Sequence, residues 1–280
     1  MNIAETIKET RRIVKEWKMQ GLTVGLVPTM GFLHEGHESL IRRCAAENDK
    51  TVVSVFVNPM QFGKNEDLEG YPRDFRRDSR ICQEAGAHLI FHPCPEEMYP
   101  PDFFTYMDMD TITEGLCGGN RPGHFRGVCT VVGKLFHIVS PDRAYFGQKD
   151  AQQLSVIKKM VRDLDFDLEI VGCPTVREAD GLAKSSRNTY LSEAERQQAT
   201  VIHRSLRYAE EAIAAGERDV KTIREEMIRM ISQQPLADID YVEFVDWGLL
   251  QPIEKLEKPA LVAVAVRFGD TRLIDNYLWE

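Results

Sequence analysis

The stretch Pro28-Thr29-Met30-Gly31-Phe32-Leu33-His34-Glu35-Gly36-His37 decides how this chain is expected to fold. An apolar run over residues 22–27 leads into it, and an amphipathic helix is expected to begin near Glu35. A strand, a tight turn and a helix N-terminus together offer backbone N–H groups and the positive end of a helix dipole to a phosphate. The stretch therefore predicts an anion-binding turn within an α/β domain.

Two histidines and two glycines make this turn a candidate site for binding and catalysis. His34 and His37 lie three positions apart, so on a first helical turn they face the same way. Imidazole N–H groups there can stabilise charge that develops on phosphate oxygens, and Gly31 and Gly36 leave room for a ligand beside the backbone. The alternative is an ordinary strand–helix junction with two surface histidines, because short motifs have many chance matches.

The composition limits the class of protein. A chain of 280 residues can form one domain or two, and its formal net charge of -9 argues against general nucleic-acid binding. A small anionic ligand needs only a local positive pocket. The six cysteines form no C-x-x-C pair, no secretory segment is visible, and no apolar run approaches membrane-spanning length. We therefore expect a cytoplasmic protein with reduced thiols.

The first part of the chain predicts a Rossmann-like domain. Apolar runs alternate with helical patterns, which is typical of a mostly parallel sheet covered by helices. The runs expected to form strands are residues 22–27, 51–57, 88–92, 143–146 and 168–171. An opening helix is expected to bury Ile3, Ile7, Ile13, Val14 and Trp17, and a second buried helix is expected over residues 128–139.

The last hundred residues predict a smaller α+β unit. Ser192 and Glu195 have capping-box spacing at the start of a long helix that should end at Gly216. A second helix over residues 220–231 and three antiparallel strands over residues 239–245, 261–268 and 271–275 are expected to follow. We therefore expect two domains, residues 1–175 and residues 176–280, the second acting as a lid.

Polar residues follow several of these strands, where ligands of open α/β sheets bind. The candidate stretches are Asn58-Pro59-Met60-Gln61-Phe62-Gly63, Arg121-Pro122-Gly123-His124, Gly147-Gln148-Lys149-Asp150 and Lys184-Ser185-Ser186-Arg187. The alternative for each stretch is a solvated loop. His88, His92 and Cys94 would share one face of a strand, but strand histidines are more often structural than metal ligands, and no fourth ligand supports a metal.

Taken in order, these motifs resemble the pantoate–β-alanine ligases, a family of the HIGH-type nucleotidyltransferase-like group. The resemblance is carried by Val27-Pro28-Thr29-Met30-Gly31 with His34-Glu35-Gly36-His37, by Phe56-Val57-Asn58-Pro59-Met60-Gln61-Phe62, by Tyr71-Pro72-Arg73, by Arg121-Pro122-Gly123-His124-Phe125-Arg126-Gly127, by Phe146-Gly147-Gln148-Lys149-Asp150, and by Arg177-Glu178-Ala179-Asp180-Gly181-Leu182 through Ser185-Ser186-Arg187-Asn188. It is strong over residues 22–192, and six motifs in order are far more specific than any one of them.

The resemblance implies a reaction in which ATP and pantoate form an enzyme-bound pantoyl adenylate, which β-alanine then converts to pantothenate. It also implies Mg²⁺ and a homodimer. By the same resemblance the catalytic residues are His37, His34 and Lys149. The implied ATP-binding residues are Met30, Gly31, Phe32, Leu33, His34, Glu35, Gly36, His37, Gly147, Gln148, Lys149, Asp150, Val176, Lys184, Ser185, Ser186 and Arg187. The implied substrate-binding residues are Gln61, Gln153, Asn58 and Arg121, and Asp78 is a candidate Mg²⁺ ligand.

Two positions depart from the pattern of the family. Cys117 stands where many relatives carry an acidic residue, and Gln148 replaces a frequent glutamate beside Lys149. Two other classes of function stay open at this point: a different nucleotidyltransferase, and a nucleotide-sensing module that binds ATP without chemistry. A second amide-lined site for a small substrate, such as Gln61 and Gln153 would provide, favours an enzyme over a sensor.

Overall fold

The computed structural model describes residues 1–63 and 68–280, and the chain divides into two compact units. The first unit consists of Met1–Asp110, Arg121–Gln148 and Val156–Pro174. The second unit consists of Thr111–Asn120, Lys149–Ser155 and Thr175–Glu280. The expected boundary near residue 175 stays a prediction, and each unit is described below by itself.

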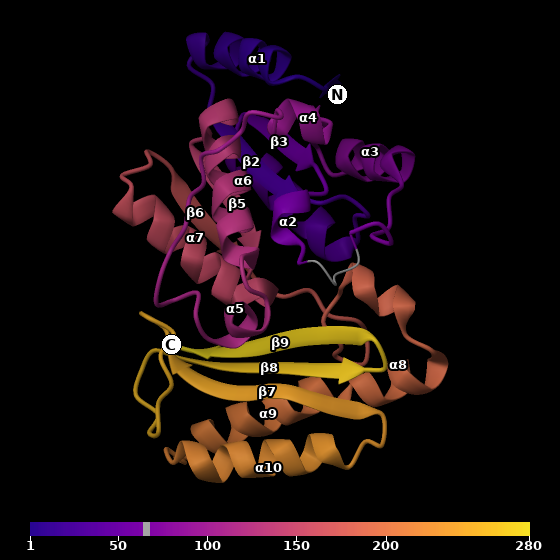
Figure 1. The fold of residues 1–280 in the computed structure, drawn as a ribbon, viewed down its shortest axis with the longest axis vertical. Coiled ribbons are helices and arrows are strands. Elements are labelled where there is room, and N and C mark those ends of the chain that lie inside the picture. The colour runs from indigo at the N-terminus through magenta and orange to yellow at the C-terminus, as the bar shows by residue number, and fades with distance from the viewer. Residues whose placement is uncertain (64–67) are drawn as a thin grey trace. The chain divides into compact units, whose positions relative to one another are not determined.

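The first unit contains a six-stranded parallel sheet (Figure 1). Its strands are β1 (Asn2–Ala4), β2 (Val24–Thr29), β3 (Lys50–Val55), β4 (Leu89–Phe91), β5 (Arg143–Gly147) and β6 (Glu169–Cys173). They lie in the order β1-β4-β3-β2-β5-β6. From β2 the chain runs outward through β3 and β4, whereas β5 and β6 extend the sheet on the other side. The order of the strands therefore reverses between β2 and β5. Sheets of this kind bind ligands at such a switch point, beyond the carboxyl ends of the strands.

Helices cover the faces of this sheet because the strands are apolar on both sides. The helical segments that begin in this unit are α1 (Ile7–Met19), α2 (Glu35–Glu47), the 3₁₀ turn η1 (Pro59–Gln61), α3 (Phe75–Glu84), α4 (Pro95–Met98) and α6 (His124–Val139). On one face, Val27 of β2, Val53 of β3 and Ile90 of β4 share a core with Leu40 and Ile41 of α2. Helices α1 and α6 pack on each other and on β2.

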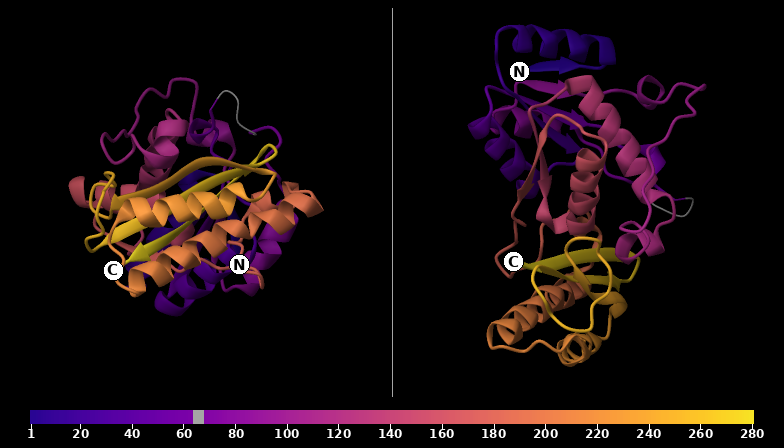
Figure 2. Two further views of the ribbon diagram at one scale, coloured as in Figure 1. Left: turned by 90° about the horizontal axis from the view of Figure 1, so that it is seen from below. Right: turned by 90° about the vertical axis from the view of Figure 1, so that its left-hand side faces the viewer.

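The second unit is built around a three-stranded antiparallel sheet. Its strands are β7 (Ala237–Asp246), β8 (Ala260–Phe268) and β9 (Thr271–Trp279). The helices assigned to it are α5 (Leu116–Asn120), the 3₁₀ turn η3 (Ser186–Tyr190), α8 (Glu193–Ala199), α9 (Val201–Ala214) and α10 (Val220–Ser232). Helices α9 and α10 lie on the same face of the sheet (Figures 1 and 2). Alternate residues of β8, such as Val262 and Val264, meet Ile202 of α9 and Ile223 of α10 in one core.

Two elements join the units along the chain. The 3₁₀ turn η2 (Gln148–Asp150) follows β5, and α7 (Ala151–Asp163) follows η2. The division between the units passes through both elements, so Gly147 and Gln148 belong to the first unit, whereas Lys149 and Asp150 belong to the second.

The predicted fold class is confirmed, with two local differences. Ile3 does not lie on the opening helix, because residues around it form β1 and pair in parallel with β4, where Ile3 is opposite Ile90. The Ser192–Glu195 capping box is present, but the helix that it starts ends at Ala199 and α9 begins at Val201. Between them the hydroxyl of Thr200 donates to the carbonyl of Gln197, a local bond that competes with the regular helical pattern. In the part of the chain that the structure describes, no helix has the length and apolar character needed to cross a bilayer.

Candidate active site

The turn after β2 is held by a buried carboxylate. Gly31 and Phe32 both have positive φ angles, +83° and +48°, so the backbone curls tightly before α2. Its N–H groups point inward, where Asp78 Oδ2 accepts from Phe32 over 2.8 Å and Asp78 Oδ1 accepts from Leu33 over 2.7 Å. A Cβ on Gly31 would lie 3.0 Å from Asp78 Oδ2. Burial raises the pKa of Asp78, and the two backbone N–H groups oppose that rise.

The two predicted histidines lie side by side at the N-terminus of α2. His34 is the N-cap residue, and its Nδ1 accepts the N–H of Gly36 over 3.1 Å. His37 Nδ1 accepts the N–H of His34 over 3.3 Å, and the ring centroids are 4.1 Å apart. Because each Nδ1 is an acceptor, each neutral ring carries its proton on Nε2. The capping arrangement thus leaves both imidazoles as N–H donors through Nε2.

A second group of polar residues follows β3. Asn58 and Gln61 are buried, with exposed fractions of 1% and 8%; Asn58 caps the turn η1, and Gln61 is its last residue. Asn58 Nδ2 donates to Gln61 Oε1 over 3.0 Å, and Gln61 Nε2 lies 3.2 Å from Met30 Sδ. The structure therefore brings Asn58, Gln61 and Met30 together in the first unit.

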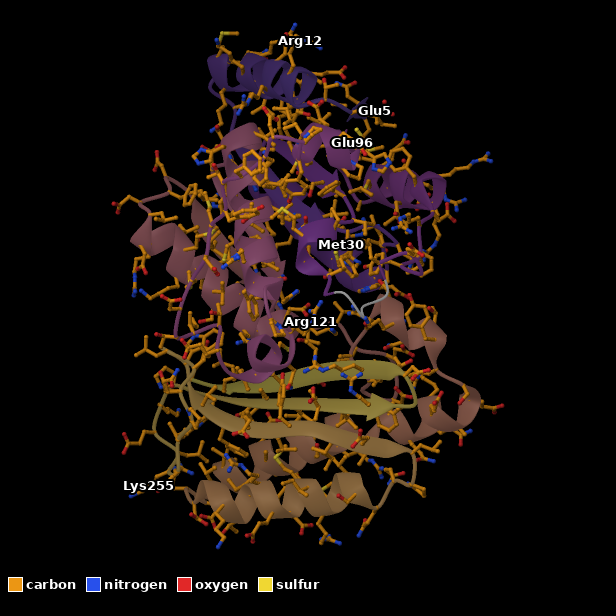
Figure 3. All side chains as sticks on the ribbon, in the orientation of Figure 1. Glu5, Arg12, Met30, Glu96, Arg121 and Lys255 are labelled. Carbon is orange, nitrogen blue, oxygen red and sulfur yellow. The ribbon has the colours of Figure 1, made fainter. Side chains whose placement is uncertain are left out.

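Arg121 and His124 support the backbone of the same group. His124 Nδ1 donates to the carbonyl of Gln61 over 2.9 Å, and Arg121 Nη2 donates to that carbonyl over 3.3 Å. Arg121 Nη1 also donates to His124 Nε2 over 3.0 Å. Figure 3 labels Met30 and Arg121, the two ends of this set of contacts. These contacts tie the predicted Arg121 to the predicted Gln61.

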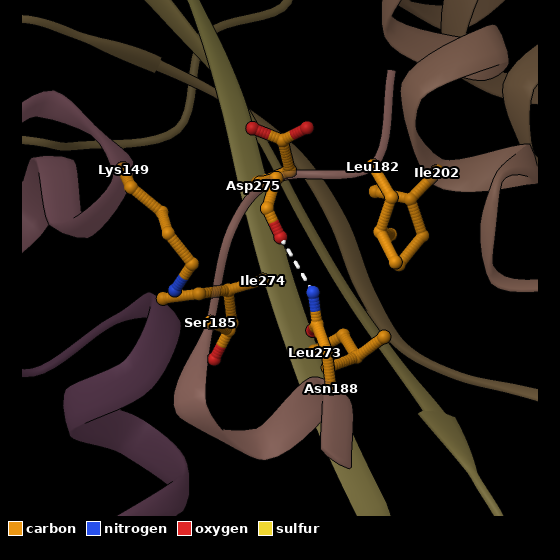
Figure 4. A pocket seen from close by; sticks show the side chains of 9 residues that line it. Lys149, Leu182, Ser185, Asn188, Ile202, Leu273, Ile274 and Asp275 are labelled. Atoms are coloured by element: carbon orange, nitrogen blue, oxygen red, sulfur yellow. Dashed lines mark hydrogen bonds between the residues drawn. The ribbon is translucent and has the colours of Figure 1, made fainter. Parts of the chain in front are cut away.

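A pocket in the second unit joins Lys149 and Ser185 (Figure 4). The side chain of Lys149 is only 19% exposed, and Nζ lies 4.0 Å from Asp150 Oδ1. The backbone carbonyl of Lys149 accepts from Asn276 Nδ2 of β9 over 2.9 Å. The wall opposite is apolar and contains Leu182 and Ile202. The pocket therefore combines a cation and a hydroxyl with an apolar wall.

The predicted segment Lys184-Ser185-Ser186-Arg187 is braced by residues that precede and follow it. Lys184 N–H donates to the carbonyl of Val176 over 2.9 Å. Asn188 Nδ2 donates to Ala183 O and to Glu178 Oε1 over 3.1 and 3.0 Å. Arg196 in turn contacts Glu178 over 2.7 Å. The segment is thus held by the hairpin of residues 177–183, which carries the acidic residue Glu178.

That hairpin is anchored to the sheet of the second unit. Arg177 donates to Asp275 Oδ2 over 2.5 Å and to Oδ1 over 3.1 Å, and it also donates to the carbonyl of Gly181. Asp275 lies on β9 and is 4% exposed. Gly181 has a φ of +92°, and a Cβ there would clash with the ring of His203. The stretch from Arg177 to Gly181 is part of the resemblance to the family, but nothing in the sequence pairs it with Asp275.

Cys117, one of the departures noted above, lies in a polar cluster of the second unit. Its backbone N–H donates to Gln152 Oε1 over 2.9 Å. Its Sγ lies 3.3 Å from Tyr241 Oη and 3.5 Å from Arg272 Nη1. Burial raises the pKa of the Tyr241 hydroxyl, and Arg272 also pairs with Asp240 over 2.6 Å. The thiol of Cys117 thus lies beside the guanidinium of Arg272, which is already paired with the carboxylate of Asp240.

The remaining candidates are described within their own units. Gln153 is half-buried on the first turn of α7 in the second unit, while its predicted partner Gln61 belongs to the first unit. Gly147 ends β5, beside β2 in the sheet. Ser185 caps η3 by accepting the N–H of Arg187 over 3.3 Å.

The histidines considered as metal ligands have other contacts. His88 Nδ1 accepts the N–H of Thr51 over 3.1 Å, and the ring of His92 stacks on Phe75 with centroids 4.0 Å apart. Over residues 1–63 and 68–280 no group of three or more His, Cys, Asp or Glu side chains is arranged to hold a metal ion. All six cysteines are free thiols.

A parallel sheet with two imidazole donors at a helix N-terminus beside its switch point defines an α/β enzyme of the nucleotide-binding class. The chain belongs to the pantoate–β-alanine ligase family, whose model matches residues 2–278. It is a ligase that condenses pantoate with β-alanine in an ATP-dependent reaction and so makes pantothenate.

Individual relatives of the family are similar to this chain over its full length. The chain is 57% identical to the pantothenate synthetase of Clostridium acetobutylicum, with 100% of both chains covered. The crystal structure of pantothenate synthetase from Thermus thermophilus superposes with a TM-score of 0.94 at 46% identity, and 99% of each chain is covered. A crystal structure of the ligase from Francisella tularensis, complexed with beta-gamma ATP and β-alanine, has a TM-score of 0.82 at 33% identity and covers 99% of this chain and 97% of that one.

Proposed function

We propose that the condensation proceeds in two steps through an enzyme-bound acyl adenylate. In the first step a carboxylate oxygen of pantoate attacks the α-phosphorus of ATP, the bond between that phosphorus and the β-phosphate bridge breaks, and pyrophosphate leaves. In the second step the amine of β-alanine attacks the acyl carbon, the bond to AMP breaks, and the amine loses a proton. The products are pantothenate, AMP and pyrophosphate.

The observation that carries this proposal is the paired histidine cap of α2. Attack on the α-phosphorus needs negative charge to be neutralised and two reactants to be aligned, and it needs no covalent nucleophile on the protein. His34 and His37 present Nε2–H donors at a helix N-terminus, where the dipole also favours negative charge. We assign to His37 the main donor role at the reacting phosphate, with His34 beside it. Lys149 neutralises the charge that develops on the phosphates.

ATP is assigned to the segments that follow β2 and β5 and to the braced segment before η3. The relative from Francisella tularensis was solved with beta-gamma ATP and β-alanine, which supports ATP and β-alanine as ligands of this chain. The proposed ATP contacts are Met30, Gly31, Phe32, Leu33, His34, Glu35, Gly36, His37, Gly147, Gln148, Lys149, Asp150, Val176, Lys184, Ser185, Ser186 and Arg187.

Pantoate is assigned to Gln61 and Gln153, with Arg121 supporting Gln61. A buried carboxamide favours a ligand that supplies a hydroxyl or carboxylate oxygen, because the buried amide loses a hydrogen bond when the ligand lacks that partner. Gln61 is 8% exposed, and the contacts of Arg121 and His124 to its carbonyl fix its backbone.

Mg²⁺ is proposed as a companion of the triphosphate, bound mainly by phosphate oxygens and water. Asp78 does not fit the role of a direct ligand well, since it is 1% exposed and both its oxygens accept backbone N–H groups of the turn. We therefore assign Asp78 to holding the turn, and we derive no step through the metal. A homodimer in a reducing, cytoplasmic compartment remains part of the proposal, and light scattering tests the dimer.

The two-step route is tested by following oxygen from pantoate. Pantoate labelled with ¹⁸O in its carboxylate should place one labelled oxygen in AMP, because the carboxylate oxygen stays on the α-phosphorus when the acyl–oxygen bond breaks. Mass spectrometry of the AMP measures this. Unlabelled AMP would rule out the adenylate and require a different activation of the acid.

A further inference from the structure

Asn58 is buried, and its hydrogen-bonding capacity is fully used inside the protein. Its side-chain nitrogen donates to the carbonyl of Gly127 over 3.1 Å and to Gln61 Oε1 over 3.0 Å. Its side-chain oxygen accepts the N–H of Met60 over 3.3 Å and the hydroxyl of Tyr99 over 2.8 Å. A carboxamide has two N–H donors and two acceptor lone pairs, so these four contacts leave none for a substrate.

The orientation of this amide is fixed by backbone groups. The N–H of Met60 can only donate, and the carbonyl of Gly127 can only accept, so the oxygen and nitrogen of Asn58 cannot exchange places. The Tyr99 hydroxyl must then donate to Asn58, and Gln61 must offer its oxygen to Asn58. The direction of every bond in the chain Tyr99–Asn58–Gln61 follows from these two backbone partners.

The same series of hydrogen bonds fixes the orientation of the Gln61 amide. Its Oε1 is held by Asn58, so its NH₂ group is the other end, 3.2 Å from Met30 Sδ in the predicted nucleotide-binding turn. The backbone of Gln61 is closely packed, since a Cβ on Gly127 of α6 would lie only 2.6 Å from Gln61 N of η1. Tyr99 itself is held at the end of α4 by its ring contact with Phe56, at 6.1 Å between centroids.

We propose that Tyr99 and Asn58 are positioning residues that hold the Gln61 carboxamide with its NH₂ toward the acid substrate. This inference rests on the proposed role of Gln61 in binding pantoate. An NH₂ group donates to an oxygen acceptor, such as a hydroxyl or carboxylate oxygen of pantoate, and it cannot accept a hydrogen bond from the ammonium of β-alanine. Gln61 thus selects the acid, and Asn58, expected above to touch substrate, acts through Gln61.

The first test removes one hydroxyl and compares it with a matched tyrosine. Tyr99→Phe should raise the KM for pantoate about threefold to tenfold, the scale of one hydrogen bond, and leave the KM for ATP within twofold. Tyr106→Phe is the control, because Tyr106 lies on the same loop region, is 50% exposed, and has no hydroxyl partner among the described residues. Tyr99→Phe that behaves like Tyr106→Phe would overturn the proposal.

A double-mutant cycle separates this role from a structural one. Tyr99→Phe added to Gln61→Ala should change the KM for pantoate less than twofold, because Tyr99 acts only through the amide that is missing. An undiminished effect in the Gln61→Ala background would contradict the proposal. If Gln61→Ala alone leaves the KM for pantoate unchanged, then the proposed function of Gln61 fails instead, which keeps the two failures distinct.

Reversing the polarity of Asn58 gives a further test. Asn58→Asp removes the side-chain N–H donors, so Gln61 Oε1 loses its partner and the amide is free to turn its NH₂ toward the new carboxylate. Its oxygen would then face the acid, and the KM for pantoate should rise more than in Tyr99→Phe. Urea unfolding of each variant identifies loss of fold, and a stable Asn58→Asp enzyme with unchanged pantoate KM would overturn the proposal.

Discussion

The carboxylate of Asp78 accepts the backbone N–H of Leu33 over 2.7 Å, across 45 positions of the sequence. Its other oxygen accepts the N–H of Phe32, so a side chain on α3 holds the turn that leads into the histidine cap of α2. Phe32 has a positive φ, which is costly for a residue with a large side chain, and the two bonds to Asp78 offset part of that cost.

Asp78→Ala should therefore destabilise the protein by about 3 kcal/mol, since two buried backbone donors lose a charged partner. The KM for ATP should rise more than the KM for pantoate, because the turn is assigned to ATP. Glu84→Ala, an exposed position on the same helix, is the control and should change stability by less than about 0.5 kcal/mol. Urea unfolding and steady-state kinetics measure both effects. An unchanged unfolding curve with a raised Mg²⁺ requirement would instead return Asp78 to the role of metal ligand.

His37→Ala should lower turnover roughly 10²- to 10³-fold, the usual scale for one donor aimed at developing charge. It also removes the acceptor of the His34 N–H, so some stability should be lost with it. Ser39→Ala is the matched control, because it removes a different first-turn bond, from the Ser39 hydroxyl to the carbonyl of Gly36, without touching an imidazole. Turnover of His37→Ala equal to that of Ser39→Ala would remove His37 from the chemistry.

The fold was largely predictable from periodicity. The buried β-branched run before Asn58 and the alternating strands of the second unit each match an observed element within a few residues. The opening strand β1 was missed, because three residues carry too little pattern and β1 exists only through its pairing with β4. The division of the long helix at Thr200 was also missed; a side-chain bond of Thr200 to the carbonyl of Gln197 accompanies it, and periodicity does not reveal such a bond.

The candidate site was predictable where residues adjacent in sequence act together. His34 and His37 meet because of helical spacing, and that meeting followed from the sequence. The supporting contacts did not follow, because Tyr99 reaches Asn58 across 41 positions and Arg177 reaches Asp275 across 98. Such partners are chosen by the tertiary fold, and a single sequence contains no local signal for them.

Arg196 should stabilise the second unit in a pH-dependent way. Burial acts to raise the pKa of Glu178, but hydrogen bonds from Arg196 and Asn188 outweigh it and lower that pKa below its ordinary value of 4.5. The hydrogen bond from Arg196 also lowers the pKa of Asp180 below 3.8. A lowered folded-state pKa gives stability above the unfolded-state value that is lost as the pH falls through the folded-state value.

Arg196→Met should therefore destabilise the protein by about 1 kcal/mol near pH 7, and the difference from the unmodified protein should shrink as the pH falls below about 4. Urea unfolding at a series of pH values from 7 to 3 measures this. Arg207→Met is the control, because Arg207 pairs with Glu210 and Glu211 on the surface with a 54% exposed side chain. A difference that stays constant down to pH 3 would contradict the assigned ion pairs.

The segment from Lys184 to Arg187 should become protected when the substrates bind. Closing over an acyl adenylate excludes the water that would hydrolyse it. Limited trypsin digestion should cut after Lys184 more slowly with saturating ATP, Mg²⁺ and pantoate than without them. Cleavage after Lys221, on the exposed face of α10, is an internal control that should not change. Equal rates at Lys184 under both conditions would end the lid hypothesis.

The most direct test of the two-step reaction is exchange of labelled pyrophosphate into ATP. Since the carboxylate of pantoate attacks the α-phosphorus before any amine is needed, the first step should run backward and forward with pantoate, ATP and Mg²⁺ alone. We predict that label enters ATP when pantoate is present and β-alanine is absent. Exchange that requires β-alanine, or that proceeds equally well without pantoate, would contradict the account.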